Sequence, residues 1–482
     1  MKTIIPFLLL LTLLLSCKEL LQETPKNFIS PDGFYKSEAD AEGAIAGVYS
    51  SVFPLNGDVK NFDEQHTDYV TGRGSFISIS NFDKILSSDQ NGRISNFWAN
   101  YFNTVNRANI VLNRVPTITA ISPATQTRIL AEARFLRAWA YFNLAINYGA
   151  VPLRTTELTD LNTVATPRAS LDKVYELILA DLLIAEKDLP ETVGSSTGKA
   201  SKWAAKMLMA RVYLTRENWA LAAEKANDVI SSGKYSLVPV GAPDDFYRIF
   251  ATTTSTSEDI MSHHPSINRQ STFINWLHGA GTPYNKGTVF GFTLLPNMAS
   301  PLIKEWADAD LRKSFNLYSK YVNASGVTVT LPSTNPWLFK KLIKDPNGNA
   351  LYMMPIFRYA EALLMYAEAA TMVEGKPSAL ALERLNSVRR RGYGLNSGAA
   401  SAVDYPAGLT KDQFRSTVLK ERAYEFMLEN IRWWDLKRTK TAKEAIEAAG
   451  KKFINERLLY PIPQAELNAN SAITQQDQNP GY

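Results

Sequence analysis

Apolar residues cover most of the circumference of the helix that the sequence predicts over residues 126–147. At 100° per residue, two neighbouring lines of apolar side chains run along this segment. A stripe this wide indicates a helix that packs against other elements on several sides. The first line consists of Ile129, Ala133, Leu136 and Ala140, and the second of Phe135, Trp139, Phe142 and Ile146.

Two further segments each predict a pair of antiparallel helices. Residues 198–237 read as a helix, a short turn at 216–218 and a second helix that ends at Gly233, and residues 358–391 repeat this pattern. When the two segments are aligned, small or branched residues match, and such residues let paired helices approach closely, as in tetratricopeptide repeats. The matched positions are Ala210 with Ala369, Ala222 with Ala381, Ala226 with Leu385, and Val229 with Val388.

A third apolar pattern contains two adjacent tryptophans, Trp433 and Trp434. The sequence T-x-x-Q at 410–413 is a capping box that predicts a helix from Lys411. If this helix continues, both indoles share an apolar sector with Phe426, so we expect them in the core. The alternative is a sugar-stacking platform with Asp435 as an acid beside it. Burial favours Asp435 as the partner of an arginine or of a backbone donor.

Long polar segments separate these patterns, at roughly 55–95 and 235–345. They are rich in Gly, Ser, Thr, Asn, Pro and aromatic residues, a composition typical of loops. Loops of this length in a compact protein are usually functional or disordered. We therefore expect a ligand site in these segments and not on the helices.

The N-terminus has the order of an export signal, MKTIIPFLLLLTLLLSC. Lys2 precedes an apolar run that is too short for a retained membrane span. Leu14-Leu15-Ser16-Cys17 has the form of a bacterial lipobox, which predicts a signal peptide over 1–16 and acylation of Cys17; the alternative is an ordinary secretory signal. Cys17 is the only cysteine of the 482 residues, so no internal disulfide is expected.

Charge and motifs exclude several functions. The formal net charge is +5, and the densest basic run, 389–391, closes a predicted helix, so we expect a solvated helix end and no nucleic-acid binding.

The four histidines show no metal-binding spacing, and His263 and His264 are adjacent. Neither a thiol nucleophile nor a nucleotide-binding motif is present, so we expect no cofactor, no metal and no enzyme activity. A glycosidase needs only two carboxylates about 5 to 9.5 Å apart, which leave no motif in the sequence, so this alternative stays open.

Several motifs together resemble one family. They are the lipobox, "EARFLRAWAYFNLAINYGAVPL" (132–153), "GKASKWAAKMLMARVYL" (198–214), "KERAYEFMLENIRWWDLKRT" (420–439) and the tail "LLYPIPQAELNANSAITQQDQNPGY" (458–482). In this order they are similar to the SusD/RagB family of outer-membrane nutrient-binding lipoproteins of Bacteroidota. The resemblance covers residues 17–482, with an N-terminal part to about 230 and a C-terminal part from about 235.

The resemblance implies a mostly α-helical protein in which tetratricopeptide-like helix pairs form a scaffold and a long, irregular, loop-rich lobe binds the ligand. It further implies a lipoprotein on the cell surface, held in the outer membrane through acylated Cys17. Its partner would be a TonB-dependent SusC-like barrel transporter, to which it delivers an oligosaccharide or polysaccharide, or in some members a peptide. The family's motifs belong to the scaffold, so they assign no binding residue.

Binding residues are therefore sought by chemistry in the loops. A sugar site needs exposed aromatic rings for stacking and polar groups for hydrogen bonds. Aromatic residues in loops can also attach the loop to the core, and this alternative stays open at each position. The candidates are His66, Asp68, Tyr69 and Arg73 in the first segment, and Asn275, Trp276, His278, Tyr284 and Trp337 in the second.

Two other functions remain open at this point. A lipid-anchored glycoside hydrolase would release product, and a helical-repeat scaffold of the envelope would bind only protein. Glycan capture without chemistry is the prediction that the sequence favours.

Overall fold

The computed structural model describes residues 34–52, 55–158, 165–194, 198–250, 256–278, 282–284, 293–343 and 349–482. The predicted signal peptide and Cys17 lie outside these ranges. Among the described helices, none is both long and apolar enough to cross a bilayer.

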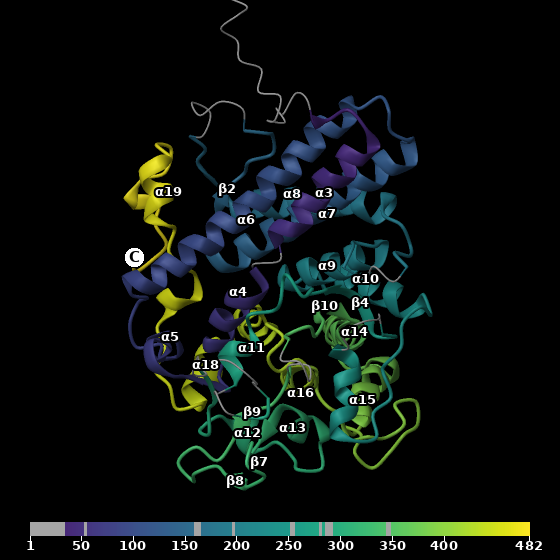
Figure 1. Cartoon of the computed structure of the whole chain (residues 1–482). Coiled ribbons are helices and arrows are strands. Elements are labelled where there is room, and N and C mark those ends of the chain that lie inside the picture. The colour runs from purple at the N-terminus through teal and green to yellow at the C-terminus, as the bar shows by residue number, and fades with distance from the viewer. Residues whose placement is uncertain are drawn as a thin grey trace, which may run out of the picture.

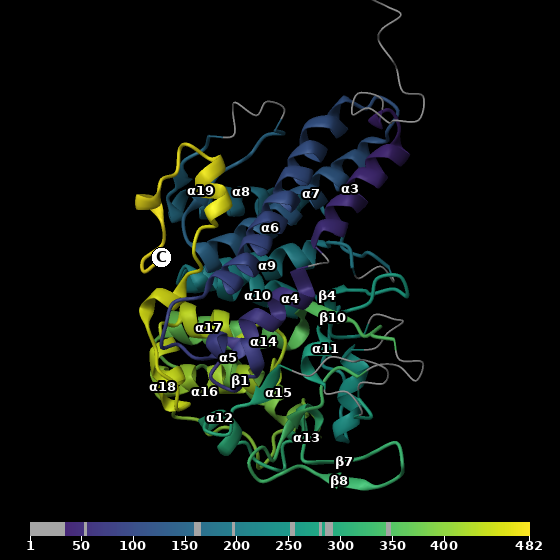
Figure 2. The ribbon, with the colours of Figure 1, turned by 60° about the vertical axis from the view of Figure 1, so that its left-hand side comes forward.

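Helices stacked side by side form the scaffold, with consecutive helices in contact (Figures 1 and 2). The chain is mostly helical, as expected. Shorter helices cover the ends and sides of this stack. The stacked helices are α3 (Glu38–Val52), α6 (Ser88–Arg114), α7 (Pro123–Tyr148), α8 (Leu171–Asp188), α9 (Lys202–Thr215), α10 (Trp219–Ser231), α14 (Tyr359–Glu374), α15 (Ala379–Gly392) and α16 (Lys411–Glu425). The shorter ones are α4 (Leu55–Gln65), α5 (Ile77–Ser80), α11 (Ile274–Leu277), α12 (Pro301–Lys304), α13 (Leu311–Asn316), α17 (Arg432–Arg438), α18 (Ala442–Ala448) and α19 (Gln464–Ala469).

Both predicted helix pairs are confirmed, as α9 with α10 and α14 with α15. The eight aligned residues, Ala210 and Ala369 among them, are all fully buried. In addition, α10 packs directly on α14, so the stack continues across the intervening segment. Small side chains at these contacts allow this close approach.

The segment between α10 and α14 forms a separate lobe. Its ends are joined by β4 (Asp259–His263) and β10 (Met354–Arg358), which pair antiparallel with Met354 opposite His263. The remaining strands are short antiparallel pairs. They are β1 (Val70–Gly72) with β5 (Leu294–Pro296), β2 (Val151–Pro152) with β3 (Arg168–Ala169), β6 (Leu317–Tyr318) with β9 (Leu338–Phe339), and β7 (Lys320–Val322) with β8 (Thr328–Thr330).

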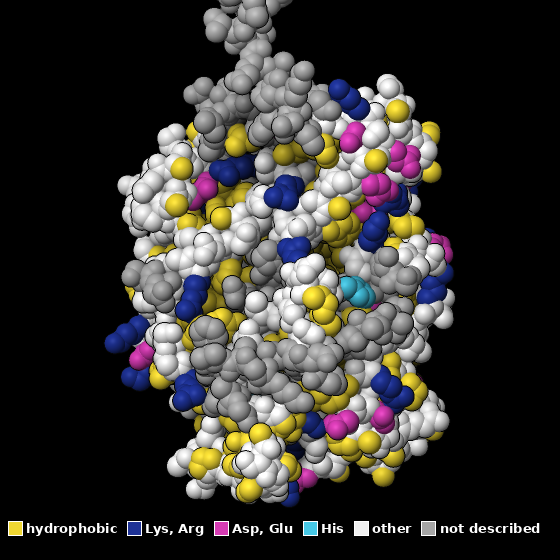
Figure 3. All heavy atoms as spheres, viewed as in Figure 1, with side chains coloured by type: hydrophobic (Ala, Val, Ile, Leu, Met, Phe, Trp, Pro, Cys, Tyr) yellow, Lys and Arg dark blue, Asp and Glu magenta, His cyan; other side chains and the backbone are white. Residues whose placement is uncertain are grey.

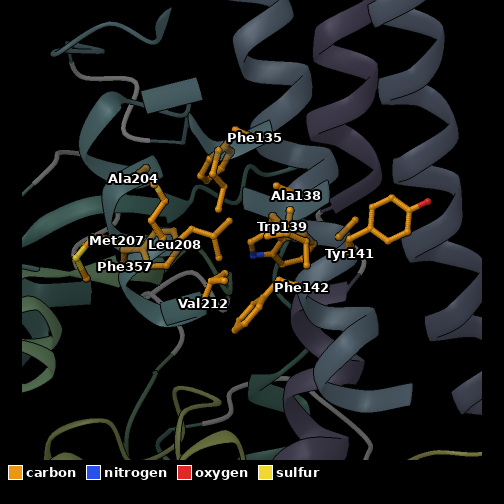
Figure 4. Packing of buried hydrophobic residues seen from close by; sticks show 14 of the residues in the cluster. Phe135, Ala138, Trp139, Tyr141, Phe142, Ala204, Met207, Leu208, Val212 and Phe357 are labelled. Carbon is orange, nitrogen blue, oxygen red and sulfur yellow. The ribbon is translucent and has the colours of Figure 1, made fainter. Parts of the chain in front are cut away.

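Two main hydrophobic cores hold these parts. The larger runs through the helical stack, where Trp139 and Phe142 of α7 point toward Leu208 and Val212 of α9 (Figure 4). The second fills the lobe and includes Trp306, whose ring stacks on Tyr424 at 4.6 Å. The wide apolar stripe of residues 126–147 is confirmed, because α7 is buried over most of its surface.

The polar segment 55–95 is more helical than predicted. Helix α4 lies in the interior: Val59 and Phe62, three residues apart, pack in the main core, and the polar residues between them and up to Gln65 are buried as well. Helix α6 begins at Ser88, where Ser87 and Gln90 form a capping box. The expectation of a continuous loop is therefore wrong at both ends of the segment.

The two adjacent tryptophans are buried, as predicted, but not on one continuous helix. Helix α16 begins with the predicted capping box and ends at Glu425; Leu428 and Asn430 then adopt positive φ values of 63° each, and α17 starts anew. Trp433 consequently packs in a small third cluster with Phe82, whereas Trp434 joins the main core.

Asp435 serves as an arginine partner, as expected. Its carboxylate lies 2.7 Å from both Arg422 and Arg438. All three side chains are buried, so the group is structural and no ligand reaches it in this conformation.

The basic run 389–391 corrects an expectation. Arg390 and Arg391 are each 1% exposed and not solvated. Arg391 pairs with Glu258 from the start of the lobe and with Glu425 from α16, and Arg390 pairs with Asp404 at 2.6 Å. Acidic partners distant in sequence compensate the cost of burying these cations.

Further buried ion pairs join this group. Arg358 lies 2.8 Å from Glu429 and 2.5 Å from Glu425, and Lys341 lies 2.7 Å from Glu429. Arg312 of the lobe bonds Glu425 at 3.1 Å. The network therefore fastens the lobe to α14–α16. On the surface, in contrast, basic and acidic side chains of the described residues are interspersed on the face shown (Figure 3).

Candidate ligand-binding surface

Strand pairing brings the two predicted loop segments together. Strand β1 lies against β5, and Arg73, just after β1, donates its backbone N–H to the carbonyl of Thr293 at 2.9 Å. Thr293 in turn donates its own N–H to the carbonyl of Trp276 at 2.9 Å. Arg73 and Trp276, over 200 residues apart in the sequence, are thus linked through one residue.

Trp276 is the centre of a small aromatic group. It belongs to α11, is half-buried, and its ring lies 5.4 Å from the ring of Phe76. The guanidinium of Arg93 covers the Phe76 ring at 4.3 Å. The indole is held by its tilted contact with Phe76, and the cation–π contact of Arg93 holds Phe76 in turn, so the indole is preorganised for stacking.

Hydrogen-bonding capacity is unused beside this indole. Trp276 Nε1 and Asn275 Oδ1 are both buried without a hydrogen-bond partner in the described part of the chain. Leaving a buried donor or acceptor unpaired costs about 1–3 kcal/mol each. A hydroxyl-bearing ligand that reached them would recover this free energy.

Tyrosines form a second group next to the first. Tyr284 lies 4.8 Å from Tyr318 and 5.6 Å from the buried ring of His278, and Tyr321 meets Tyr318 edge-on at 6.1 Å. Burial raises the pKa of Tyr284 and of Tyr318, so both hydroxyls stay protonated at neutral pH and can donate. The sequence analysis did not name Tyr318 and Tyr321 as candidates, because they lie in a polar stretch. The one signal for them was the high content of aromatic residues in the segment 235–345.

Trp337 lies in the same lobe but with other neighbours. It precedes β9, is half-buried, and Lys313 Nζ lies 5.7 Å from its ring. Among the described residues, no ring contact joins Trp337 to the Trp276 group or to the Tyr284 group. Lys313 is itself held by the carbonyl of Trp306 at 2.8 Å. Trp337 is therefore a separate candidate.

Three candidates from the first segment lie in the interior and not on an exposed loop. His66 and Tyr69 are 0% exposed and Asp68 is 2% exposed. The reason is that the chain turns inward after α4, where each polar side chain finds a partner. In this conformation a ligand does not reach His66 or Tyr69.

The partners of these three side chains explain their burial. His66 Nδ1 lies 2.8 Å from the Phe62 carbonyl and Nε2 lies 3.2 Å from Arg457. Burial and the charge of Arg457 lower the pKa of His66, so the ring is neutral at pH 7. Asp68 pairs with Arg432 at 2.8 Å.

Tyr69 is held in the same way. Its hydroxyl donates to Glu64 and accepts the backbone N–H of Leu428 at 3.0 Å. It therefore connects α4 to the turn after α16. Of the four candidates in the first polar segment, only Arg73 is exposed.

No group of three or more His, Cys, Asp or Glu residues with metal-binding geometry occurs within the described ranges. The aromatic rings and hydroxyls suit a ligand with flat apolar faces and many hydroxyls.

The fold and this surface define a class of protein: a helical-repeat scaffold that carries an irregular binding lobe. Comparison with known proteins gives the family. A model described as "SusD family" matches residues 314–482, and one described as "Starch-binding associating with outer membrane" matches residues 28–214. The chain belongs to the SusD/RagB family.

Relatives match along nearly the whole chain. SusD-like protein P2 of Formosa agariphila is 28% identical, covering 99% of each chain. A SusD-like protein of Bacteroides ovatus is 24% identical, covering 84% of this chain and 76% of its own.

Solved structures share the fold. A SusD homolog from Bacteroides thetaiotaomicron has a TM-score of 0.79 at 23% identity, covering 94% of this chain and 98% of its own. A laminarin binding SusD-like protein has a TM-score of 0.73 at 23% identity, covering 93% and 100%. Surface glycan-binding protein A from Bacteroides fluxus has a TM-score of 0.71 at 22% identity, covering 93% and 100%.

Proposed function

We propose that this protein captures a glycan at the surface around Trp276 and Tyr284 and delivers it to a TonB-dependent SusC-like transporter. Acylated Cys17 would hold it on the outer membrane at the cell surface. The observation that carries the proposal is the presence in the lobe of two aromatic groups, Trp276 on Phe76 and Tyr284 with Tyr318, together with the unused Nε1 of Trp276. Sugars present flat C–H faces and hydroxyls that match both features.

The comparisons support the same class of ligand. Two relatives in fold are named for binding laminarin and surface glycans, and one matching family model is described as starch-binding. Which glycan this chain binds would depend on its loop residues. Arg73, Asn275, Trp276, Tyr284 and Trp337 are the proposed contacts.

A binding screen with matched variants tests the proposal. The full chain, purified in detergent, is titrated with a panel of polysaccharides, and the hit is repeated with Trp276→Ala. We expect saturable binding without product, and a loss of affinity of about tenfold or more, equivalent to about 1.4 kcal/mol. Trp219→Ala is the control, because Trp219 is half-buried like Trp276 but belongs to the scaffold, where the guanidinium of Arg415 lies 5.1 Å from its ring.

The outcomes separate the alternatives. Release of reducing ends would identify a glycoside hydrolase instead. Equal loss in Trp219→Ala and Trp276→Ala would remove the assignment of the surface. Binding of peptides but of no glycan would change the substrate class, and co-purification of a barrel from detergent-solubilised membranes tests the delivery step separately.

A further inference from the structure

A cleft lies at the junction of the scaffold and the lobe, where α9 contacts β4 (Figure 1). Its volume is about 370 Å³, which falls within the range of small-ligand sites. The walls come from the loop after α8, the residue that caps α9, the turn after α10, and the chain that enters β4. They include Thr192, Ser201, Tyr235, Thr256, Asp259 and Ile260.

Hydroxyl groups are the main polar feature of this cleft. The side chains that supply them are Thr192, Ser201, Tyr235 and Thr256. Two of these hydroxyls are positioned by the backbone: Ser201 Oγ accepts the N–H of Ala204 at 3.2 Å, and Thr256 Oγ1 accepts the N–H of Glu258 at 3.3 Å. Each hydroxyl can donate one hydrogen bond and accept two, so the set keeps donors and acceptors for a ligand after these contacts.

Tyr235 also supplies an aromatic ring. It is half-buried, packs against the main core and lines the cleft. Burial raises the pKa of the Tyr235 hydroxyl to about 12, so this group is protonated at neutral pH. The ring is thus held in place by the core and can stack on a flat C–H face while its hydroxyl bonds to a polar group.

The charges of the cleft favour a neutral ligand. Asp259 is 5% exposed, and its Oδ1 accepts the hydroxyl of Ser262 at 2.5 Å. At the rim, the carboxylate of Glu191 lies 3.4 Å from Lys234 and 3.3 Å from Lys202, so its charge is compensated. An anionic ligand would lie beside the carboxylate of Asp259 and be repelled, whereas the hydroxyls of a neutral ligand can donate to this carboxylate.

We propose that this cleft is a separate carbohydrate-binding site for one neutral sugar residue, with the sugar ring on Tyr235 and its hydroxyls on Ser201 and Asp259. The size suits this ligand, because a cavity of about 150 Å³ already admits a benzene ring. A volume of about 370 Å³ therefore leaves room for a pyranose ring and its hydroxyls. The site shares no residue with the surface around Trp276, so it is independent of the proposed glycan capture.

Sugar titrations of a chain that lacks the first surface test this site. The full chain with Trp276→Ala, in detergent, is titrated with glucose, galactose, mannose and N-acetylglucosamine and followed by saturation-transfer NMR. We expect saturable binding of at least one of these sugars with a Kd in the millimolar range.

Two further substitutions, each added to Trp276→Ala, assign the binding to the cleft. Thr192→Trp places a bulky side chain at the rim and should weaken sugar binding at least tenfold; Thr192 is exposed, so the fold should tolerate the change. Thr119→Trp is the matched control, because Thr119 is also an exposed loop residue but does not line the cleft. Tyr235→Ala should weaken binding as Thr192→Trp does, and circular dichroism checks that it folds.

Two results would overturn the proposal: none of the four sugars binding up to about 10 mM, or Thr192→Trp binding as tightly as Thr119→Trp. The comparison of Thr192→Trp with Thr119→Trp can be made on the unaltered chain as well, so it stands even if Trp276→Ala misfolds. Failure of polysaccharide capture at Trp276 would leave these results unchanged, because that surface is disabled in the titrations.

Discussion

The buried ion-pair network gives the sharpest stability prediction, the replacement of Arg358 by methionine. Arg358 ends β10 and caps α14, and its guanidinium bonds Glu429 at 2.8 Å and Glu425 at 2.5 Å. It also donates to the Glu425 carbonyl at 2.7 Å and lies over Phe426 at 4.3 Å. Arg358→Met removes the guanidinium from the Phe426 ring and leaves three acidic side chains, Glu258 among them, with fewer cations.

The magnitude follows from this geometry. Removing one partner of a buried ion pair costs about 3–5 kcal/mol, because the remaining charge stays buried. We therefore expect Arg358→Met to lower the free energy of unfolding by about 3–5 kcal/mol at pH 7. Arg216→Met is the control: Arg216 pairs with Asp172 on the surface, with side chains 39% and 72% exposed. Its loss should cost less than about 1 kcal/mol.

The pH dependence gives an independent check of the cause. Burial by itself would raise the pKa of Glu429, but the charges of Arg358 and Lys341 outweigh burial and lower it. A carboxyl with a lowered folded pKa stabilises the protein above its unfolded pKa, and this stability is lost as pH falls. In Arg358→Met burial should dominate and raise the pKa, so protonation relieves the defect. The difference between the two proteins should then shrink from pH 7 toward pH 5.

Urea unfolding followed by far-ultraviolet circular dichroism measures both quantities. If Arg358→Met loses no more stability than Arg216→Met, the network contributes little. If the gap widens on acidification, the electrostatic explanation is wrong.

Three further predictions concern other parts of the chain. Arg457→Met should destabilise residues 78–84, seen as faster amide hydrogen exchange there, because Arg457 donates to the carbonyls of Ser78, Ile79, Asn81 and Lys84; unchanged exchange would contradict this. Ala369→Leu should lower stability by about 1–3 kcal/mol in thermal unfolding, since Ala369 is 0% exposed in the helix stack, whereas the same change at the exposed Ala220 of α10 should not. Burial raises the pKa of Glu64 to about 7. The protonated carboxyl of Glu64 therefore stabilises the folded state fully below about pH 4.5, and this contribution is lost as the pH rises through 7. Relative to Glu64→Gln, the unaltered chain should thus lose stability from pH 4.5 to 7, and parallel pH profiles would exclude this linkage.

Much of the scaffold follows from the sequence, because it depends on neighbours within one or two helical turns. The spacing of apolar residues located α7 and the two helix pairs, and T-x-x-Q at 410–413 located the start of α16. The same periodicity placed Trp433 and Trp434 in the interior. The prediction of one continuous helix from Lys411 is wrong beyond Glu425, because Leu428 and Asn430 have positive φ and interrupt the helix.

The candidate surface was predicted only in part. The aromatic residues of the polar segments included Trp276 and Tyr284, which the structure places half-buried in the lobe; their role as ligand contacts stays a prediction. Nothing local separates Tyr69, which is buried, from Tyr284, which is not. The deciding factor is whether a partner such as the Leu428 backbone, distant in sequence, receives the hydroxyl.

The sequence by itself determined the helical repeat character, the family and the region in which a ligand is to be sought. Only the tertiary structure decided that β4 pairs with β10 to close the lobe, and that Arg390 and Arg391 are buried and paired. The physical reason is the separation along the chain between the residues that set each feature. Helix periodicity and capping are set by residues three or four positions apart, whereas the solvation and pairing of a charge depend on groups that meet only when the chain folds.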